Sequence, residues 1–128
     1  MLTTTNNQMS EQGYSYINLE YMEMMADGDA EMKQVMLDML LTELPEELEK
    51  MIQLLNNENW EELGSVSHKM KSTLAFVGNP DMTNANKDIE TLAKTAEGTS
   101  KIPELMKTME EVCPLVLEEL KKEQGQLS

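Results

Sequence analysis

The chain has 128 residues, of which 40% are hydrophobic and 27% charged, so it can form one packed domain and is not compositionally disordered. Its formal net charge of −14 argues against nucleic acid and against an anionic membrane surface as partners, because binding to both relies on clustered Lys and Arg. Aromatic residues make up only 4% and β-branched residues are sparse, whereas Met, Leu, Glu and Lys abound, which predicts an all-α fold.

The chain contains a single cysteine, Cys113, which has no partner for an internal disulfide and so fits a reducing compartment. The first residues, MLTTTNNQMSEQG, lack the basic region and apolar run of a signal peptide. No apolar run approaches the length of a membrane span. We therefore expect a soluble cytoplasmic protein.

Residues 1–15 are polar and show no periodicity, which predicts a flexible N-terminal tail. A short amphipathic helix is expected next, with apolar positions at Ile17, Leu19, Met22 and Met25. The segment ADGDA then ends this helix, with Gly28 as the stop and Asp29 as the N-cap of the following one.

The longest predicted helix spans about residues 30–55, because apolar residues recur there at spacings of three and four. Pro45 lies inside it and removes one helical hydrogen bond, so a kink or a split is expected at that point. The residues expected to face the core are Met32, Val35, Met36, Met39, Leu40, Leu44, Leu48, Met51, Ile52 and Leu55.

A third helix is predicted over about residues 60–77, after a turn at residues 56–59. Asn59 is its expected N-cap, and Glu62 stands in the position of a capping box. Gly78 is expected to end it, because glycine readily adopts the left-handed conformation that closes many helices.

Two further helices are expected, one over about residues 81–96 and one over about residues 102–122, the latter bent at Pro114. Residues 123–128 are expected to form a C-terminal tail. Long helices with short connections bury their apolar stripes most simply as an antiparallel four-helix bundle, here residues 16–122, with the short N-terminal helix across one end. The 13 methionines are interpreted as adaptable core residues rather than ligands.

His68 is the only histidine of the chain, and helical geometry places it opposite the apolar stripe of the third helix. A histidine packed in the core is therefore not expected. The residues within about 60° of it on the helix surface are Glu61, Gly64, Ser65, Lys71, Ser72 and Ala75. Most of these are small, so a large partner could approach the imidazole closely.

An exposed imidazole beside a lysine suits few kinds of chemistry. A metal site normally takes three or four ligands, and a hydrolase needs a nucleophile, a base and an oxyanion hole, which one helix face does not supply. Imidazole can itself act as a nucleophile near neutral pH, and Lys71 could supply positive charge to a phosphoryl group. A surface histidine without any chemical role remains the alternative.

The chain resembles the histidine-containing phosphotransfer (HPt) domain family over about residues 16–120. Counted from its histidine, the family has an aliphatic residue at position two, Lys at three, and small or hydroxyl residues at four and five. Ala near position seven, a hydrophobic residue at nine and Gly at ten follow, then a hydrophobic residue at 14 and a hydrophobic–Glu pair at 21 and 22. The corresponding residues are His68, Met70, Lys71, Ser72, Thr73, Ala75, Val77, Gly78, Met82, Ile89 and Glu90. Ser72 departs from the family, which usually has Gly at that position.

The resemblance implies a phosphorelay intermediate rather than an enzyme with its own turnover. His68 would accept a phosphoryl group from a phospho-aspartate of one receiver domain and pass it to the aspartate of another. Lys71 would hold the phosphoryl oxygens, and the expected docking residues are Gly64, Ser65, Ser72 and Ala75. Mg²⁺ would belong to the receiver, so no cofactor and no metal site are expected in this chain, which is expected to be a monomer.

Two alternatives remain open from the sequence. One is a helical bundle that docks receiver domains or other proteins without carrying phosphate. The other is an unrelated acidic helical scaffold that would bind no receiver at all.

Overall fold

The fold is that of a computed structural model, which describes residues 13–127. Its elements are the helices α2 (Glu20–Ala26), α3 (Ala30–Asn56), α4 (Trp60–Val77), α5 (Pro80–Thr95) and α6 (Ile102–Leu127), with a 3₁₀ turn η1 (Thr99–Lys101) before α6. No strand occurs within this range, so the predicted all-α class is confirmed.

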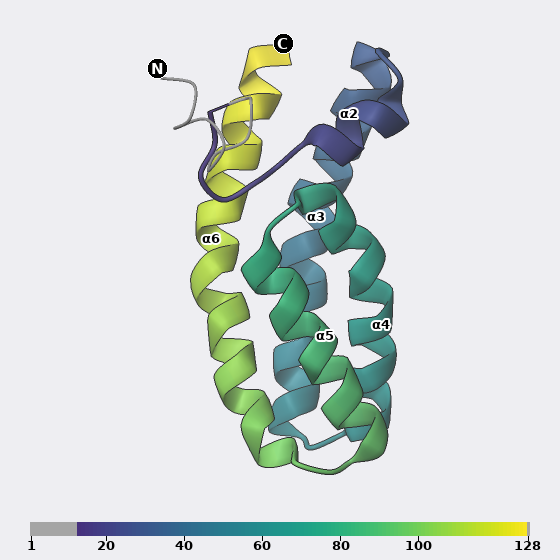
Figure 1. Cartoon of the computed structure of the whole chain (residues 1–128), viewed down its shortest axis with the longest axis vertical. Coiled ribbons are helices and arrows are strands. Elements are labelled where there is room, and N and C mark those ends of the chain that lie inside the picture. The colour runs from purple at the N-terminus through teal and green to yellow at the C-terminus, as the bar shows by residue number, and fades with distance from the viewer. Residues whose placement is uncertain (1–12, 128) are drawn as a thin grey trace, which may run out of the picture.

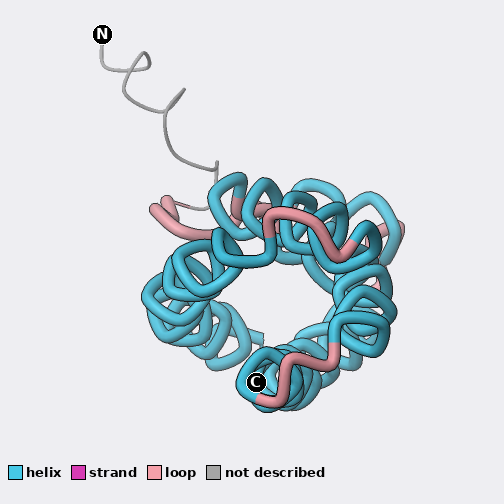
Figure 2. The backbone as a smooth tube through the Cα atoms, turned by 90° about the horizontal axis from the view of Figure 1, so that it is seen from below, coloured by secondary structure: helices cyan, strands magenta, loops and turns pink. Residues whose placement is uncertain are grey.

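The four long helices form an antiparallel bundle, as expected (Figure 1). Each packs against two neighbours, in the order α3, α4, α5 and α6, and α6 closes the ring against α3. The view along the bundle in Figure 2 shows the four helices around a common axis. Helix α2 lies across one end, where it contacts α3 and α4, so the predicted short N-terminal helix is confirmed as well.

The helix ends follow the local chemistry of the sequence. The side chain of Asp29 accepts hydrogen bonds from two backbone N–H groups of α3, and that of Asn59 accepts one from the backbone of Glu62. Gly78 closes α4 with a φ of 72°, and a Cβ there would overlap the carbonyl oxygen of Asn18. Glycine is therefore required both by the left-handed backbone and by the close approach of the segment before α2.

Helix α3 runs without interruption through Pro45, so the chain is not split there. Proline removes only one helical hydrogen bond. Leu37, Leu40 and Leu44 before Pro45 and Leu48 and Met51 after it are buried in the same core. Their shared burial outweighs the lost hydrogen bond.

The first half of α3 departs from the predicted core pattern. Met32, Val35 and Met39 are 44%, 52% and 45% exposed. The hydrogen bond from Thr73 to Glu47 shows which turns of α4 and α3 lie side by side, and the start of α3 extends beyond the last turn of α4 (Figure 1). Helix α4 therefore does not cover Met32, Val35 and Met39.

The structure also differs from the expected limits of the folded domain. Residues 1–12 lie outside the described range, but Tyr14, within the expected N-terminal tail, is only 7% exposed. At the other end, α6 continues past Lys122 to Leu127, and Glu123 is 6% exposed. Residues 14–17 and the last turns of α6 contact each other.

We call this contact the N-terminal clasp; it consists of Tyr14, Lys33, Glu119 and Glu123. The hydroxyl of Tyr14 donates to Glu123 at 2.8 Å, and the ammonium of Lys33 donates to the same carboxylate at 2.6 Å. The carboxylate of Glu119 accepts the backbone N–H groups of residues 15–17 at 2.8–3.1 Å. The segment before α2 is thereby tied to the last turns of α6.

Candidate functional site

His68 lies on the outer face of α4, and its side chain is 58% exposed. Its Nδ1 atom is 2.7 Å from Oε2 of Glu90, which comes from α5 and lies 22 residues further along the chain. The Glu90 side chain is only 11% exposed, so it supports the imidazole from below while the opposite edge of the ring faces outward.

The carboxylate of Glu90 contacts three basic side chains, those of His68, Lys71 and Lys94. Lys94 reaches it at 2.7 Å and Lys71 at 3.4 Å, and both lysine side chains are about half exposed. The hydrogen bond from Lys94 is the main cause that lowers the pKa of Glu90 to about 2; burial opposes it, and His68 and Lys71 add to it. Glu90 is therefore ionised throughout the physiological pH range.

An ionised carboxylate only accepts hydrogen bonds, which assigns the proton of the neutral imidazole to Nδ1 of His68. The lone pair is then on Nε2, at the exposed edge of the ring. The site thus consists of a nucleophilic nitrogen facing outward and a buried anion that balances positive charge on the ring.

A buried polar contact fixes the alignment of α4 with α5. The Ser67 hydroxyl lies 2.9 Å from the carbonyl oxygen and 2.8 Å from the side-chain oxygen of Asn86. The amide of Asn86 donates in return to the carbonyl of Ser67 at 3.0 Å. Because Ser67 precedes His68 and Glu90 lies one turn after Asn86, this contact brings the imidazole and the carboxylate together.

The predicted docking residues do not all lie on the surface. Ser65, Ser72 and Ala75 are exposed on the same side of α4 as His68. Gly64 is buried, and a Cβ there would lie 3.1 Å from the Cγ atom of Lys94. The expectation that Gly64 faces a partner is therefore corrected: its missing side chain lets α5 approach α4 and makes room for Lys94.

Two residues of this site had no assigned role in the sequence analysis. Glu90 was part of the family pattern, and Lys94 was not singled out. The only sequence signal for Lys94 is its spacing of four residues from Glu90, which favours an ion pair on one helix.

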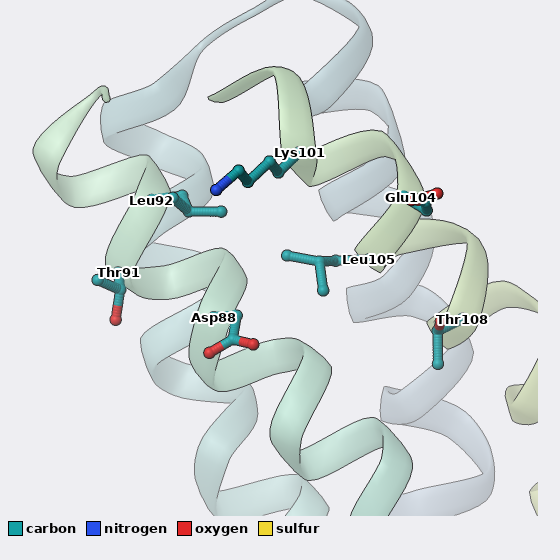
Figure 3. Close-up of a pocket in the computed structure, with 7 residues that line it drawn as sticks. All are labelled: Asp88, Thr91, Leu92, Lys101, Glu104, Leu105 and Thr108. Atoms are coloured by element: carbon teal, nitrogen blue, oxygen red, sulfur yellow. The ribbon is translucent and has the colours of Figure 1, made fainter. Parts of the chain in front are cut away.

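Away from the His68 site, a hollow with a volume of about 610 Å³ lies between α5 and the start of α6. Figure 3 shows Asp88 on one wall, Glu104 on the other, and Lys101, Leu92 and Leu105 between the two helices. This wide hollow carries mixed charges and shares no lining residue with the His68 site. It therefore adds nothing to the chemistry of the imidazole.

Residues 13–127 include no helix that is long and apolar enough to cross a membrane. They also include no group of three or more His, Cys, Asp or Glu side chains arranged to hold a metal ion.

Comparison with known proteins identifies the family. No curated protein and no solved structure matches the chain significantly. The family model of the Hpt domain matches residues 35–125, which include most of α3, all of α4 and α5, and α6 up to its last turn. The chain therefore belongs to the Hpt domain family, whose members carry phosphoryl groups in phosphorelays.

Proposed function

We propose that His68 accepts a phosphoryl group on Nε2 from a phospho-aspartate of a receiver domain and passes it to the aspartate of another. The observation that supports this most strongly is the 2.7 Å contact between Nδ1 of His68 and the buried carboxylate of Glu90. It keeps the nucleophilic lone pair on the nitrogen that a partner can reach.

In the transfer step, the Nε2 lone pair attacks phosphorus and forms an N–P bond. The bond from phosphorus to the aspartate oxygen breaks, and its electron pair remains on the aspartate carboxylate. The ring keeps its Nδ1 proton and becomes cationic, and Glu90 stabilises that charge. Lys71 and Lys94, both half exposed and both bound to the carboxylate that contacts His68, would supply positive charge to the phosphoryl oxygens.

The remaining parts of the proposal concern the partner and the kind of activity. The protein carries the phosphoryl group without turnover of its own, as a monomer in the cytoplasm. Mg²⁺ belongs to the acidic pocket of the receiver. The small exposed side chains of Ser65, Ser72 and Ala75 leave room for the receiver above His68.

The proposal is tested by mixing the protein with receiver domains that have been phosphorylated with labelled acetyl phosphate. We expect label to move to the protein, to be labile in acid and stable in base, and to map to the peptide that contains His68. Label on another residue, or no label from any of a panel of receivers, would contradict the proposal.

Substitution of Glu90 tests its role in positioning the ring. Glu90→Ala should slow transfer at saturating receiver by about 10–100-fold, by analogy with the range found for side chains that orient metal-binding histidines. Glu90→Gln keeps a hydrogen-bond acceptor but no charge, so its rate should lie between that of Glu90→Ala and that of the wild type. Asp88→Asn, on the same helix but exposed, serves as the control and should change the rate less than twofold.

The readout that separates positioning from folding is the ¹⁵N NMR spectrum of the imidazole. The wild type should show the proton on Nδ1, and Glu90→Ala should show a mixture of both tautomers. An unchanged tautomer in a folded Glu90→Ala variant would exclude the assigned role.

A further inference from the structure

A groove with a volume of about 240 Å³ lies between α4 and α5 beside the site. We call it the Lys87 groove; it is lined by Lys71, Leu74, Thr83, Asn86 and Lys87. Leu74 and Asn86 form its floor and are each 1% exposed, whereas Lys71, Thr83 and Lys87 are exposed at its rim. Lys71 also contacts Glu90, so the groove is continuous with the His68 site.

The floor of the groove offers a ligand little surface, because Leu74 and Asn86 are each 1% exposed. The side-chain oxygen and nitrogen of Asn86 are both taken up by Ser67. Leu74 contributes only carbon atoms. A ligand therefore contacts mainly the rim, where the carbon stems of Lys71 and Lys87 and the methyl group of Thr83 offer apolar contact and their ammonium and hydroxyl groups offer polar recognition.

The rim of the groove is positively charged in a protein of net charge −14. The ammonium of Lys87 makes no ion pair with any residue of the described range. The neighbouring Asp88 belongs to the other side of α5, where it lines the hollow towards α6. The groove thus presents two ammonium groups, one held by Glu90 and one without a carboxylate.

We propose that the Lys87 groove receives a carboxylate-bearing side chain of the receiver, next to an apolar one, and that Lys87 selects receivers by pairing with that carboxylate. This inference rests on the proposed function. A free small anion is a poor occupant, because the exposed rim of this open groove offers it only two flexible lysines and the Thr83 hydroxyl as donors. A receiver already docked over His68 would cover the groove and remove water from the ion pair.

The test measures the initial rate of transfer to His68 against the concentration of a phosphorylated receiver that labels the wild type. Lys87→Glu should raise KM on the order of tenfold and leave the limiting rate unchanged, because it reverses the charge of docking and not of chemistry. Lys107→Glu makes the same charge change on the exposed surface of α6 and should alter KM less than twofold.

A charge exchange identifies the partner group. Replacing acidic residues of that receiver with lysine, one at a time, should yield one variant that restores the KM of Lys87→Glu. If Lys87→Glu and Lys107→Glu have the same KM, or if Lys87→Glu lowers only the limiting rate, the groove is not a docking site, although His68 remains the carrier. If even the wild type accepts no label, the proposed function and the groove are both refuted.

Discussion

Replacing His68 with glutamine is expected to abolish phosphoryl transfer to the protein altogether. A carboxamide nitrogen has no lone pair available for attack, whereas its N–H can still donate to Glu90. The side chain is 58% exposed and its contact to the protein interior is that one carboxylate, so the free energy of unfolding should change by less than about 0.5 kcal/mol. Gel or mass-spectrometric detection of the label, together with chemical denaturation, measures both effects.

The same variant separates a carrier from a bundle that only docks receivers. If the protein is a carrier, His68→Gln should bind a receiver with nearly wild-type affinity, measured by calorimetry, while it accepts no label. A module that only docks would show the same affinity in both forms, and its wild type would remain unlabelled as well. Label that persists in His68→Gln would place the phosphoryl group elsewhere.

Replacing Lys33 with methionine is expected to be the most destabilising single change in the N-terminal clasp. The Lys33 and Glu123 side chains are 11% and 8% exposed, and the substitution leaves the Glu123 carboxylate buried without its cation. Breaking a buried ion pair in this way costs about 3–5 kcal/mol of unfolding free energy. Urea denaturation measures it, and Lys122→Met, on the exposed side of α6, is the control with an expected change below about 0.5 kcal/mol.

A double substitution keeps this prediction testable if Lys33→Met does not fold. Lys33→Met combined with Glu123→Gln removes both charges and should recover a large part of the lost stability. If the double variant is less stable than Lys33→Met, the ion pair is not the source of the effect.

The pH dependence of the clasp follows from the directions of its pKa shifts. Burial raises the pKa of Glu123, but the hydrogen bonds from Lys33 and Tyr14 outweigh it and hold the pKa below the ordinary value of 4.5. Burial and the hydrogen bond to Glu123 raise the pKa of Tyr14 from 10.0 to about 12. Stability from Glu123 is thus lost as the pH falls below 4.5, and stability from Tyr14 is lost as the pH rises from 10.0 towards 12.

The sequence predicted the helices well because apolar spacing, caps and turn residues are local properties. It could not predict Glu90 as the partner of His68, because the rotation of α5 relative to α4 depends on the buried contact between Ser67 and Asn86. The same limit explains Gly64. Helical geometry correctly places Gly64 on the same face of α4 as His68. It cannot show that α5 packs against α4 at this point and covers Gly64.

The exposed apolar residues of α3 show a second limit. Periodicity indicates that a stripe exists, but not how far the neighbouring helix extends along it, so Met32 and Val35 were assigned to the core. Likewise, nothing local in the sequence links Tyr14 with Glu123, since 109 residues separate them. Contacts between residues so far apart in the sequence can be identified only from the three-dimensional arrangement of the helices.

The N-terminal clasp also constrains how the chain can fold while it is being synthesised. Tyr14 leaves the ribosome 109 residues before its partner Glu123, a delay of roughly 5 to 20 seconds at usual rates of translation. Throughout that time the apolar side chains of Ile17, Leu19 and Met22 have no complete core to enter. The segment before α2 therefore gains its full set of contacts only after Glu119 and Glu123 have left the ribosome, and until then it has only its contacts with earlier residues, such as the hydrogen bond from Asn18 to Val77.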